Sequence, residues 1–178
     1  MKSAHLLSAL AAAAALAASA PAALAQNAGS TTGAASLTVG NVLTVSRQSD
    51  LAFGRIVISS AGSPATVTVG TSNAVTGINN ATELTGGTIT SGVFNVTGVG
   101  GSTYAVTFPQ ASVSLGAGTN PPTVDTFSTN LASGIGQLSG TSADIGLQSF
   151  NVGAVLHVPP NTAAGNYSGT FQVNVAYN

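Results

Sequence analysis

The chain has 178 residues, no cysteine, three Lys or Arg residues, four Asp or Glu residues and a formal net charge of −1. Nucleic acid is a poor partner for such a chain, because neutralising phosphates requires clustered Lys and Arg. A basic helix that lies on a membrane surface is excluded for the same reason. Without cysteine, an exported form of this chain depends on packing and backbone hydrogen bonds alone.

The first 25 residues have the pattern of a secretory signal. Lys2 precedes an apolar stretch at 6–20, and residues 23–25, Ala-Leu-Ala, fit the small-x-small cleavage rule. We therefore expect cleavage before Gln26, and no integral membrane segment in the mature chain. The mature protein is expected in the periplasm, at the cell surface or outside the cell.

An extension follows the signal. Residues 26–33, QNAGSTTG, are small and polar, which is typical of a flexible tail. Apolar residues then alternate with small polar ones up to residue 45, which predicts a strand. This strand either begins the folded domain or serves another purpose. We expect a signal peptide at 1–25, an N-terminal extension at 26–45 and one folded domain at 46–178.

The remainder of the chain reads as an all-β domain. Short runs rich in Val, Thr, Ile and Phe alternate with Gly, Ser, Asn and Pro clusters, as in β-sandwiches. Few charges are present to blunt the sheet edges, so we expect another copy of the chain to cover them. The predicted strands are 51–58, 65–69, 92–97, 103–108, 112–115, 123–127, 150–158 and 169–177.

Two pairs of these strands are predicted to form antiparallel hairpins. Strands 92–97 and 103–108 flank a glycine turn, and strands 150–158 and 169–177 flank the turn PPNTAAGN. Each strand alternates apolar and polar residues, so each hairpin has one face in the core. On the last strand, the residues expected to be buried are Phe171, Val173, Val175 and Tyr177.

No catalytic, cofactor-binding or metal-binding residue is predicted. The mature chain has a single histidine, His157, which the alternation of its strand places on the outer face as a plain surface residue. There is no cysteine nucleophile, no Gly-x-Ser-x-Gly elbow and no phosphate-binding glycine loop. The four carboxylates are far apart in sequence, and no metal-ligand spacing occurs. We therefore expect a protein that is not an enzyme.

Three stretches together resemble a known family: SDLAFGRIVIS (49–59), YAVTFP (104–109) and VPPNTAAGNYSGTFQVNVAYN (158–178). This family of small exported bacterial proteins is domain of unknown function 4402. It is similar in turn to spore-coat-U-like and archaic chaperone–usher pilin subunits. The resemblance implies an immunoglobulin-like (pilin-like) β-sandwich that lacks its final strand.

The pilin-like relatives also imply a mechanism. A periplasmic chaperone lends the missing strand during export, and at the outer-membrane usher the N-terminal extension of the next subunit replaces it. The matching donor strand would be Ala35, Leu37, Val39, Leu43 and Val45. The matching C-terminal strand that a chaperone contacts would be Phe171, Val173, Val175 and Tyr177. The chain departs from many pilins in having no disulfide.

Two functions follow as expectations. The first is a structural subunit of a fimbria, fibre or coat, joined to itself or to other surface subunits by β-strand addition. The alternative is a secreted monomeric sandwich that binds carbohydrate or adheres to a surface through its loops, which requires exposed aromatic residues. Most Phe and Tyr residues stand in the core phase of their strands, and this favours the first function.

Overall fold

A computed structural model describes residues 34–37, 39–60, 62–117 and 119–178 of the chain. The predicted signal peptide and the polar tail at 26–33 lie outside these residues. The chain divides between residues 37 and 38 into two units, and every strand belongs to the second. The second unit is therefore the folded domain.

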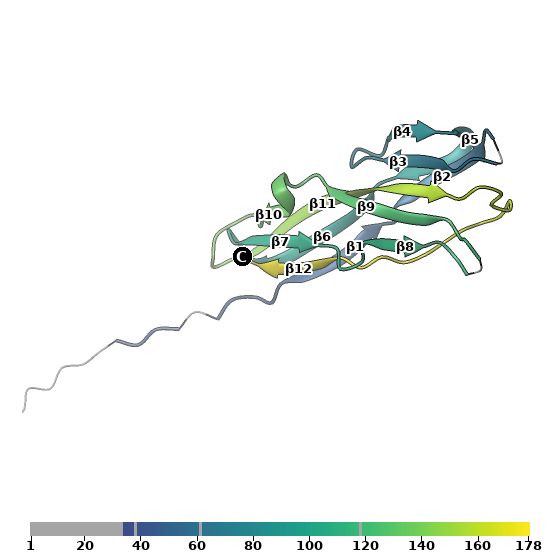
Figure 1. The fold of residues 1–178 in the computed structure, drawn as a ribbon. Coiled ribbons are helices and arrows are strands. Elements are labelled where there is room, and N and C mark those ends of the chain that lie inside the picture. The colour runs from purple at the N-terminus through teal and green to yellow at the C-terminus, as the bar shows by residue number, and fades with distance from the viewer. Residues whose placement is uncertain (1–33, 38, 61, 118) are drawn as a thin grey trace, which may run out of the picture. The chain divides into compact units, whose positions relative to one another are not determined.

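A seven-stranded antiparallel sheet forms the larger layer of this domain (Figure 1). Its longest strand, β11 (Ile145–Val158), pairs with β6 along its first half and with β3 and β9 along its second half. β11 therefore holds the two parts of the sheet together. The other strands are β1 (Thr44–Ser49), β3 (Ala65–Val69), β4 (Val75–Asn79), β6 (Gly92–Val99), β8 (Ser112–Ser114) and β9 (Thr123–Thr129).

Two smaller sheets face this layer. One has the order β10 (Ile135–Gln137), β7 (Thr103–Thr107), β12 (Asn174–Tyr177), and the other pairs β2 (Ala52–Ile58) with β5 (Ala81–Thr90). All strand pairs are antiparallel. Apart from one 3₁₀ turn, Ala132–Gly134, the described residues contain no helix. The predicted all-β, sandwich-type fold class is confirmed.

The first half of β11 and the sheet of β7 enclose the first hydrophobic cluster. Phe150 of β11 is completely buried, and its ring stacks on that of Phe94 of β6 with centroids 5.6 Å apart. Tyr104 of β7 closes the cluster from the facing layer, and its hydroxyl donates a 2.9 Å hydrogen bond to Gln148 Oε1. The buried members are Phe94, Val96, Tyr104, Val106, Leu138, Phe150 and Val152.

The second half of β11 and the β2–β5 pair enclose the second cluster. Its buried members are Ala65, Val67, Val124, Ala154, Leu156 and Val158. From the facing layer, Phe53, Ile56 and Ile58 of β2 are only partly buried against it. The five inward residues predicted for β11, Phe150, Val152, Ala154, Leu156 and Val158, are all buried, which confirms the alternation.

Both predicted hairpins are wrong. β6 has β1 on one edge and β11 on the other, so no edge is left for β7, which pairs instead with β10 and β12 in the facing sheet. β11 likewise pairs with β6, β3 and β9, and the returning chain crosses to pair as β12 with β7. Each turn therefore carries the chain from one layer to the other.

Other differences concern strand boundaries. The predicted strand 35–45 begins at Thr44, and the predicted strand 169–177 is a strand only over Asn174–Tyr177. Three strands were not predicted: β4, β5 and β10. β4 is mostly exposed, β5 has an irregular burial pattern with half of its residues exposed, and β10 has only three residues, so none of them shows a regular apolar phase.

Phe150→Ala is expected to lower the free energy of unfolding by about 3–5 kcal/mol, because it leaves a cavity in the first cluster. Leu147→Ala is the matched control, since Leu147 lies on the outer face of the same strand and is 49% exposed. Its effect is expected within about 1 kcal/mol of zero. Urea denaturation of the mature protein measures both, and equal losses would show that β11 does not alternate as described.

Candidate strand-binding groove

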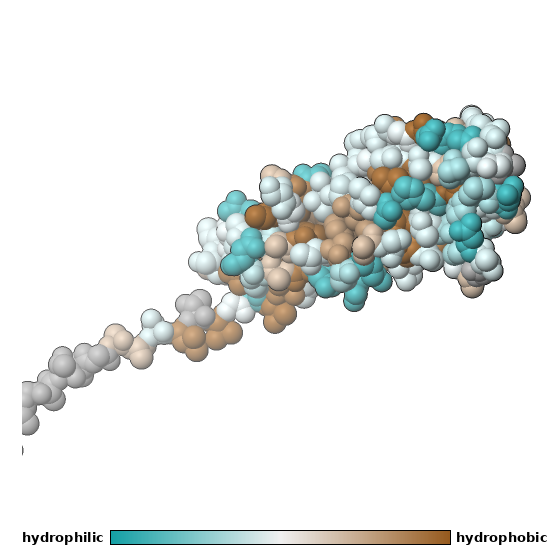
Figure 2. All heavy atoms as spheres, viewed as in Figure 1, coloured by the Kyte–Doolittle hydropathy of each residue, from teal (hydrophilic) through white to brown (hydrophobic). Residues whose placement is uncertain are grey.

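A groove of about 1160 Å³ opens onto the second hydrophobic cluster. One wall is β2 with the Gly86–Thr88 part of β5, and the other is the chain segment 161–171 that leads toward β12. In the space-filling view, apolar side chains (brown) are visible in hollows between polar ones on the surface of the domain (Figure 2). The apolar floor of the groove consists of Phe94, Val113, Leu115, Val124, Phe127, Leu156 and Val158.

The β2 wall presents an open strand edge. Within the described part of the chain, β5 is the only strand that pairs with β2. The pair is kinked between Phe53 and Arg55, where Gly54 adopts a φ of +70° that favours glycine. Gly87 of β5 faces this kink so closely that a Cβ there would collide with the backbone nitrogen of Arg55.

The opposite wall is irregular chain without strand partners among the described residues. Residues 163–173 belong to no strand, and residues 163–170 are exposed. Within the segment, the Tyr167 hydroxyl donates to the Ala163 carbonyl at 2.8 Å. The Gln172 N–H donates to Gln110 Oε1 at 2.8 Å, which ties the segment to the chain ahead of β8. Phe171 anchors the segment by stacking on Phe127, with centroids 5.0 Å apart. The groove thus lies between two backbone edges that no described strand covers.

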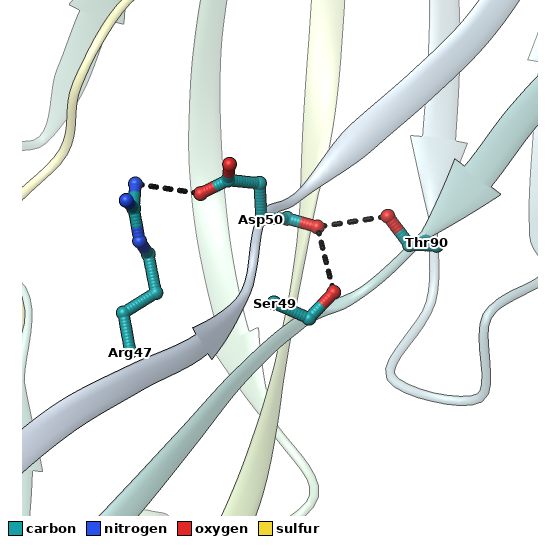
Figure 3. A network of polar contacts seen from close by, with 4 residues as sticks. All are labelled: Arg47, Ser49, Asp50 and Thr90. Carbon is teal, nitrogen blue, oxygen red and sulfur yellow. Dashed lines mark hydrogen bonds and ion pairs between the residues drawn. The ribbon is translucent and has the colours of Figure 1, made fainter.

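The chain changes sheets at one end of this groove, between β1 and β2 (Figure 3). The carbonyl of Asp50 accepts a 2.8 Å hydrogen bond from the Thr90 hydroxyl at the end of β5, and a 3.5 Å one from the Ser49 hydroxyl. The Asp50 carboxylate pairs with Arg47 at 2.6 Å, with both side chains largely exposed. These contacts fix the direction in which β2 leaves the large sheet.

The structure separates the five predicted donor residues into two groups. Leu43 and Val45 are partly buried against the first cluster, and β1 pairs with β6 from Thr44 onward. These last residues of the predicted extension are therefore part of the folded domain. Ala35, Leu37 and Val39 are exposed and lie in no strand; Leu37 is 86% and Val39 83% exposed.

The C-terminal residues face the core as predicted but are less buried than predicted. Phe171, Val173 and Val175 are partly buried against the first cluster. For Tyr177 the prediction of burial is wrong, because its side chain is 40% exposed at the end of the domain. Its hydroxyl instead accepts a hydrogen bond from the Val99 N–H at 2.7 Å and donates one to the Asn41 carbonyl at 3.0 Å.

Groups that could carry acid–base or metal chemistry are few. His157 lies on the outer face as predicted, but it is not a plain surface residue, because its Nε2 is 3.0 Å from Asp125 Oδ1. Burial raises the pKa of Tyr104, and hydrogen bonds from the Thr141 hydroxyl and N–H lower the pKa of Asp144. None of these four groups lines the groove.

Among the described residues, no group of three His, Cys, Asp or Glu could hold a metal ion. No helix in the same part of the chain is long and apolar enough to cross a membrane.

Sequence reasoning predicted β2 but missed the other parts of the two walls, β5 and residues 161–168. β5 and residues 161–168 lack an apolar alternation, so no pattern marked them as neighbours of β2. The pair Gly86-Gly87 was the available signal, because adjacent glycines within a strand indicate a close backbone approach.

Comparison with family models gives a match to "Domain of unknown function (DUF4402)" over residues 43–177. The matched region begins one residue before β1 and ends with β12, so it includes both walls and the floor of the groove. A search of curated proteins and a search of solved structures each returned no match.

Gly87→Ala is expected to destabilise the domain by about 1–3 kcal/mol, because the new methyl group would overlap the backbone of β2. Gly62→Ala is the control, since a Cβ at Gly62 meets nothing within 4 Å. That change is expected to stay within about 0.5 kcal/mol of zero. Thermal unfolding compares the two, and an unaffected Gly87 variant would contradict the close approach of β5 to β2.

Proposed function

The chain belongs to the domain of unknown function 4402 family, and we propose that it is a non-enzymatic, exported structural subunit of a bacterial surface fibre or coat that assembles by β-strand addition. The observation that carries this proposal is the groove between β2 and residues 161–171. Its walls are two open backbone edges and its floor is apolar.

Strand addition satisfies both features of the groove at once. A strand placed between the walls would form main-chain hydrogen bonds with β2 and with residues 163–171, and alternate side chains would cover the floor. Exposed strand edges are an aggregation hazard unless a partner covers them, and Val113, Leu115 and Phe127 of the floor are partly exposed. A sandwich that lacks one strand is also what the resemblance of residues 49–59, 104–109 and 158–178 to spore-coat-U-like and chaperone–usher pilin subunits implies.

A donor for such a groove is present in the same chain. Ala35, Leu37 and Val39 alternate with small residues, as a strand with one apolar face requires. They are exposed, so no packing has to be broken before they enter a groove. Leu43 and Val45 are already used in the first cluster, which restricts the proposed donor to residues 35–39.

The proposed route to the surface uses the same groove. After export, a periplasmic chaperone would fill the groove until an outer-membrane usher passes the subunit to the next one. Phe171, Val173 and Val175 belong to the chain segment that begins in one wall and continues into β12. In this proposal the chaperone contacts that segment near Phe171, the member of the predicted C-terminal set that lines the groove.

A second candidate, a carbohydrate- or surface-binding module, has one observation in its favour. Tyr167 lines the groove and is 40% exposed, so its ring could serve as a sugar platform. A glycan-array screen separates the two functions, because binding by the wild-type monomer that Tyr167→Ala abolishes would favour the module.

Deleting residues 26–40 from the mature protein is expected to leave a folded domain that no longer assembles, because β1 and its core contacts remain while the donor is lost. Leu37→Asp in the full mature chain is expected to weaken assembly at least about 10-fold, since it places a charge against an apolar floor. Light scattering and analytical ultracentrifugation after refolding at high concentration measure both.

Ser36→Asp is the matched control, because it adds the same charge to the neighbouring position, which belongs to the polar phase of the segment. It is expected to assemble nearly as well as the wild type. Oligomers formed equally by the deletion variant would rule out residues 26–40 as donor, and equal effects of the two Asp variants would show that the segment does not bind as a strand.

A further inference from the structure

The positive charges of the folded domain gather at the groove. Past the predicted signal peptide, the Lys and Arg residues of the chain are Arg47 and Arg55, and both line the groove on its β1–β2 side. Asp50 is the one acidic residue that lines it. The other acidic residues lie elsewhere: Glu83, Asp125 and Asp144. The groove therefore has a positive rim in a chain whose remaining carboxylates face other surroundings.

Arg55 is placed by a β-bulge and has no acidic partner. The register between β2 and β5 shifts at Gly54, and bulges of this kind re-aim the neighbouring side chain. A Cβ at Gly87 of β5 would collide with the backbone nitrogen of Arg55 and would lie 3.1 Å from its Cβ, so the position of Arg55 is tightly fixed. Arg55 is exposed, and no ion pair within the described part of the chain includes it.

Arg47 occupies a phase of its strand that is otherwise apolar. Leu43 and Val45 precede it in this phase and pack against the first cluster. Arg47 is directly opposite Phe94 of the groove floor, and opposed residues of an antiparallel pair project from the same face. Its partner Asp50 leaves it accessible, because the two side chains are 65% and 72% exposed (Figure 3). A second carboxylate can therefore reach Arg47.

An apolar floor beside accessible guanidinium groups defines one ligand chemistry. Small-molecule sites are mostly apolar clefts with a few placed polar groups, and a groove of about 1160 Å³ is large enough for such a ligand. Guanidinium groups bind carboxylates with two parallel hydrogen bonds. The matching ligand is thus an apolar chain that ends in a carboxylate.

The proposed donor strand does not use these arginines. Residues 26–45 contain no Asp or Glu, so no carboxylate of that segment can pair with Arg47 or Arg55. A peptide strand also directs only every second side chain to the floor, whereas a hydrocarbon chain is apolar along its whole length. The two arginines consequently favour a ligand other than the donor.

We propose that the groove also binds a long-chain fatty acid, with its hydrocarbon chain on the apolar floor and its carboxylate paired with Arg55, while Arg47 is a second cation within the same rim. This inference goes beyond the proposed function, because it gives the groove a small-molecule ligand. A fatty acid and a strand would cover the same floor, so each excludes the other.

Equilibrium dialysis with dodecanoate tests the inference. The mature wild type is compared with the full mature chain carrying Leu37→Asp, because a groove occupied by another copy would hide the site. Dodecanoate is expected to bind, and 1-dodecanol, which has the same chain without the charge, is expected to bind at least about 3-fold more weakly, as one solvated ion pair implies. Raising the salt concentration is expected to reduce this difference.

Three variants in the Leu37→Asp background identify the charges involved. Arg55→Gln is expected to weaken dodecanoate binding at least about 3-fold and to leave dodecanol binding unchanged. Asp50→Asn is expected to act in the opposite direction, because it removes a repelling carboxylate and releases Arg47. Glu83→Gln is the matched control, since Glu83 is exposed on β5 and does not line the groove.

Each other outcome has a defined meaning. Equal binding of dodecanoate and dodecanol, or unchanged binding by Arg55→Gln, would overturn the inference. An alternating Val/Asp peptide that binds while dodecanoate does not would assign the arginines to a protein partner and overturn it likewise. Light scattering of the wild type tests assembly separately. A protein that assembles but whose Leu37→Asp variant ignores dodecanoate would lose this inference alone, and one that binds dodecanoate without assembling would lose the proposed function alone.

Discussion

The continuity of β11 is the constraint on which the rest of the domain depends. Its inward residues contribute to both hydrophobic clusters, and it is hydrogen-bonded to β6, β3 and β9. A strand of this length presents more apolar surface than either small sheet can cover alone. The facing layer therefore consists of two sheets, one over each cluster, and the chain must cross between the layers several times.

The groove follows from this division of the facing layer. Over the first cluster, β7 lies between β10 and β12 and the cover is continuous. Over the second cluster, β2 has β5 on one edge and no described strand on the other, and residues 163–170 run past as exposed, unpaired chain. Val124, Leu156 and Val158 are buried, but Val113, Leu115 and Phe127 beside them remain partly accessible to water, and a further strand would cover them.

The sequence was sufficient for the features that depend on local alternation. The phase of Phe150 to Val158 and the core positions of Phe94 and Tyr104 follow from a period of two, whatever the partners are. Strand pairing depends on which strand edges are already occupied. The two hairpins were inferred because their strands are neighbours along the chain, and both inferences were wrong. The hydroxyl of Tyr177 was equally beyond reach, because its two partners, Val99 and Asn41, are far from it in sequence.

Tyr177 also shows how a residue that fits a core pattern can serve outside the core. Its ring continues the phase of Phe171, Val173 and Val175, but its position at the end of β12 leaves the hydroxyl beside two backbone groups of the opposite layer and the extension. Glycine at position 98 is what admits it there. With few charges to protect strand edges, the chain depends on backbone geometry to decide which edges of the folded domain meet, and the Tyr177 hydroxyl is one contact that joins the two layers.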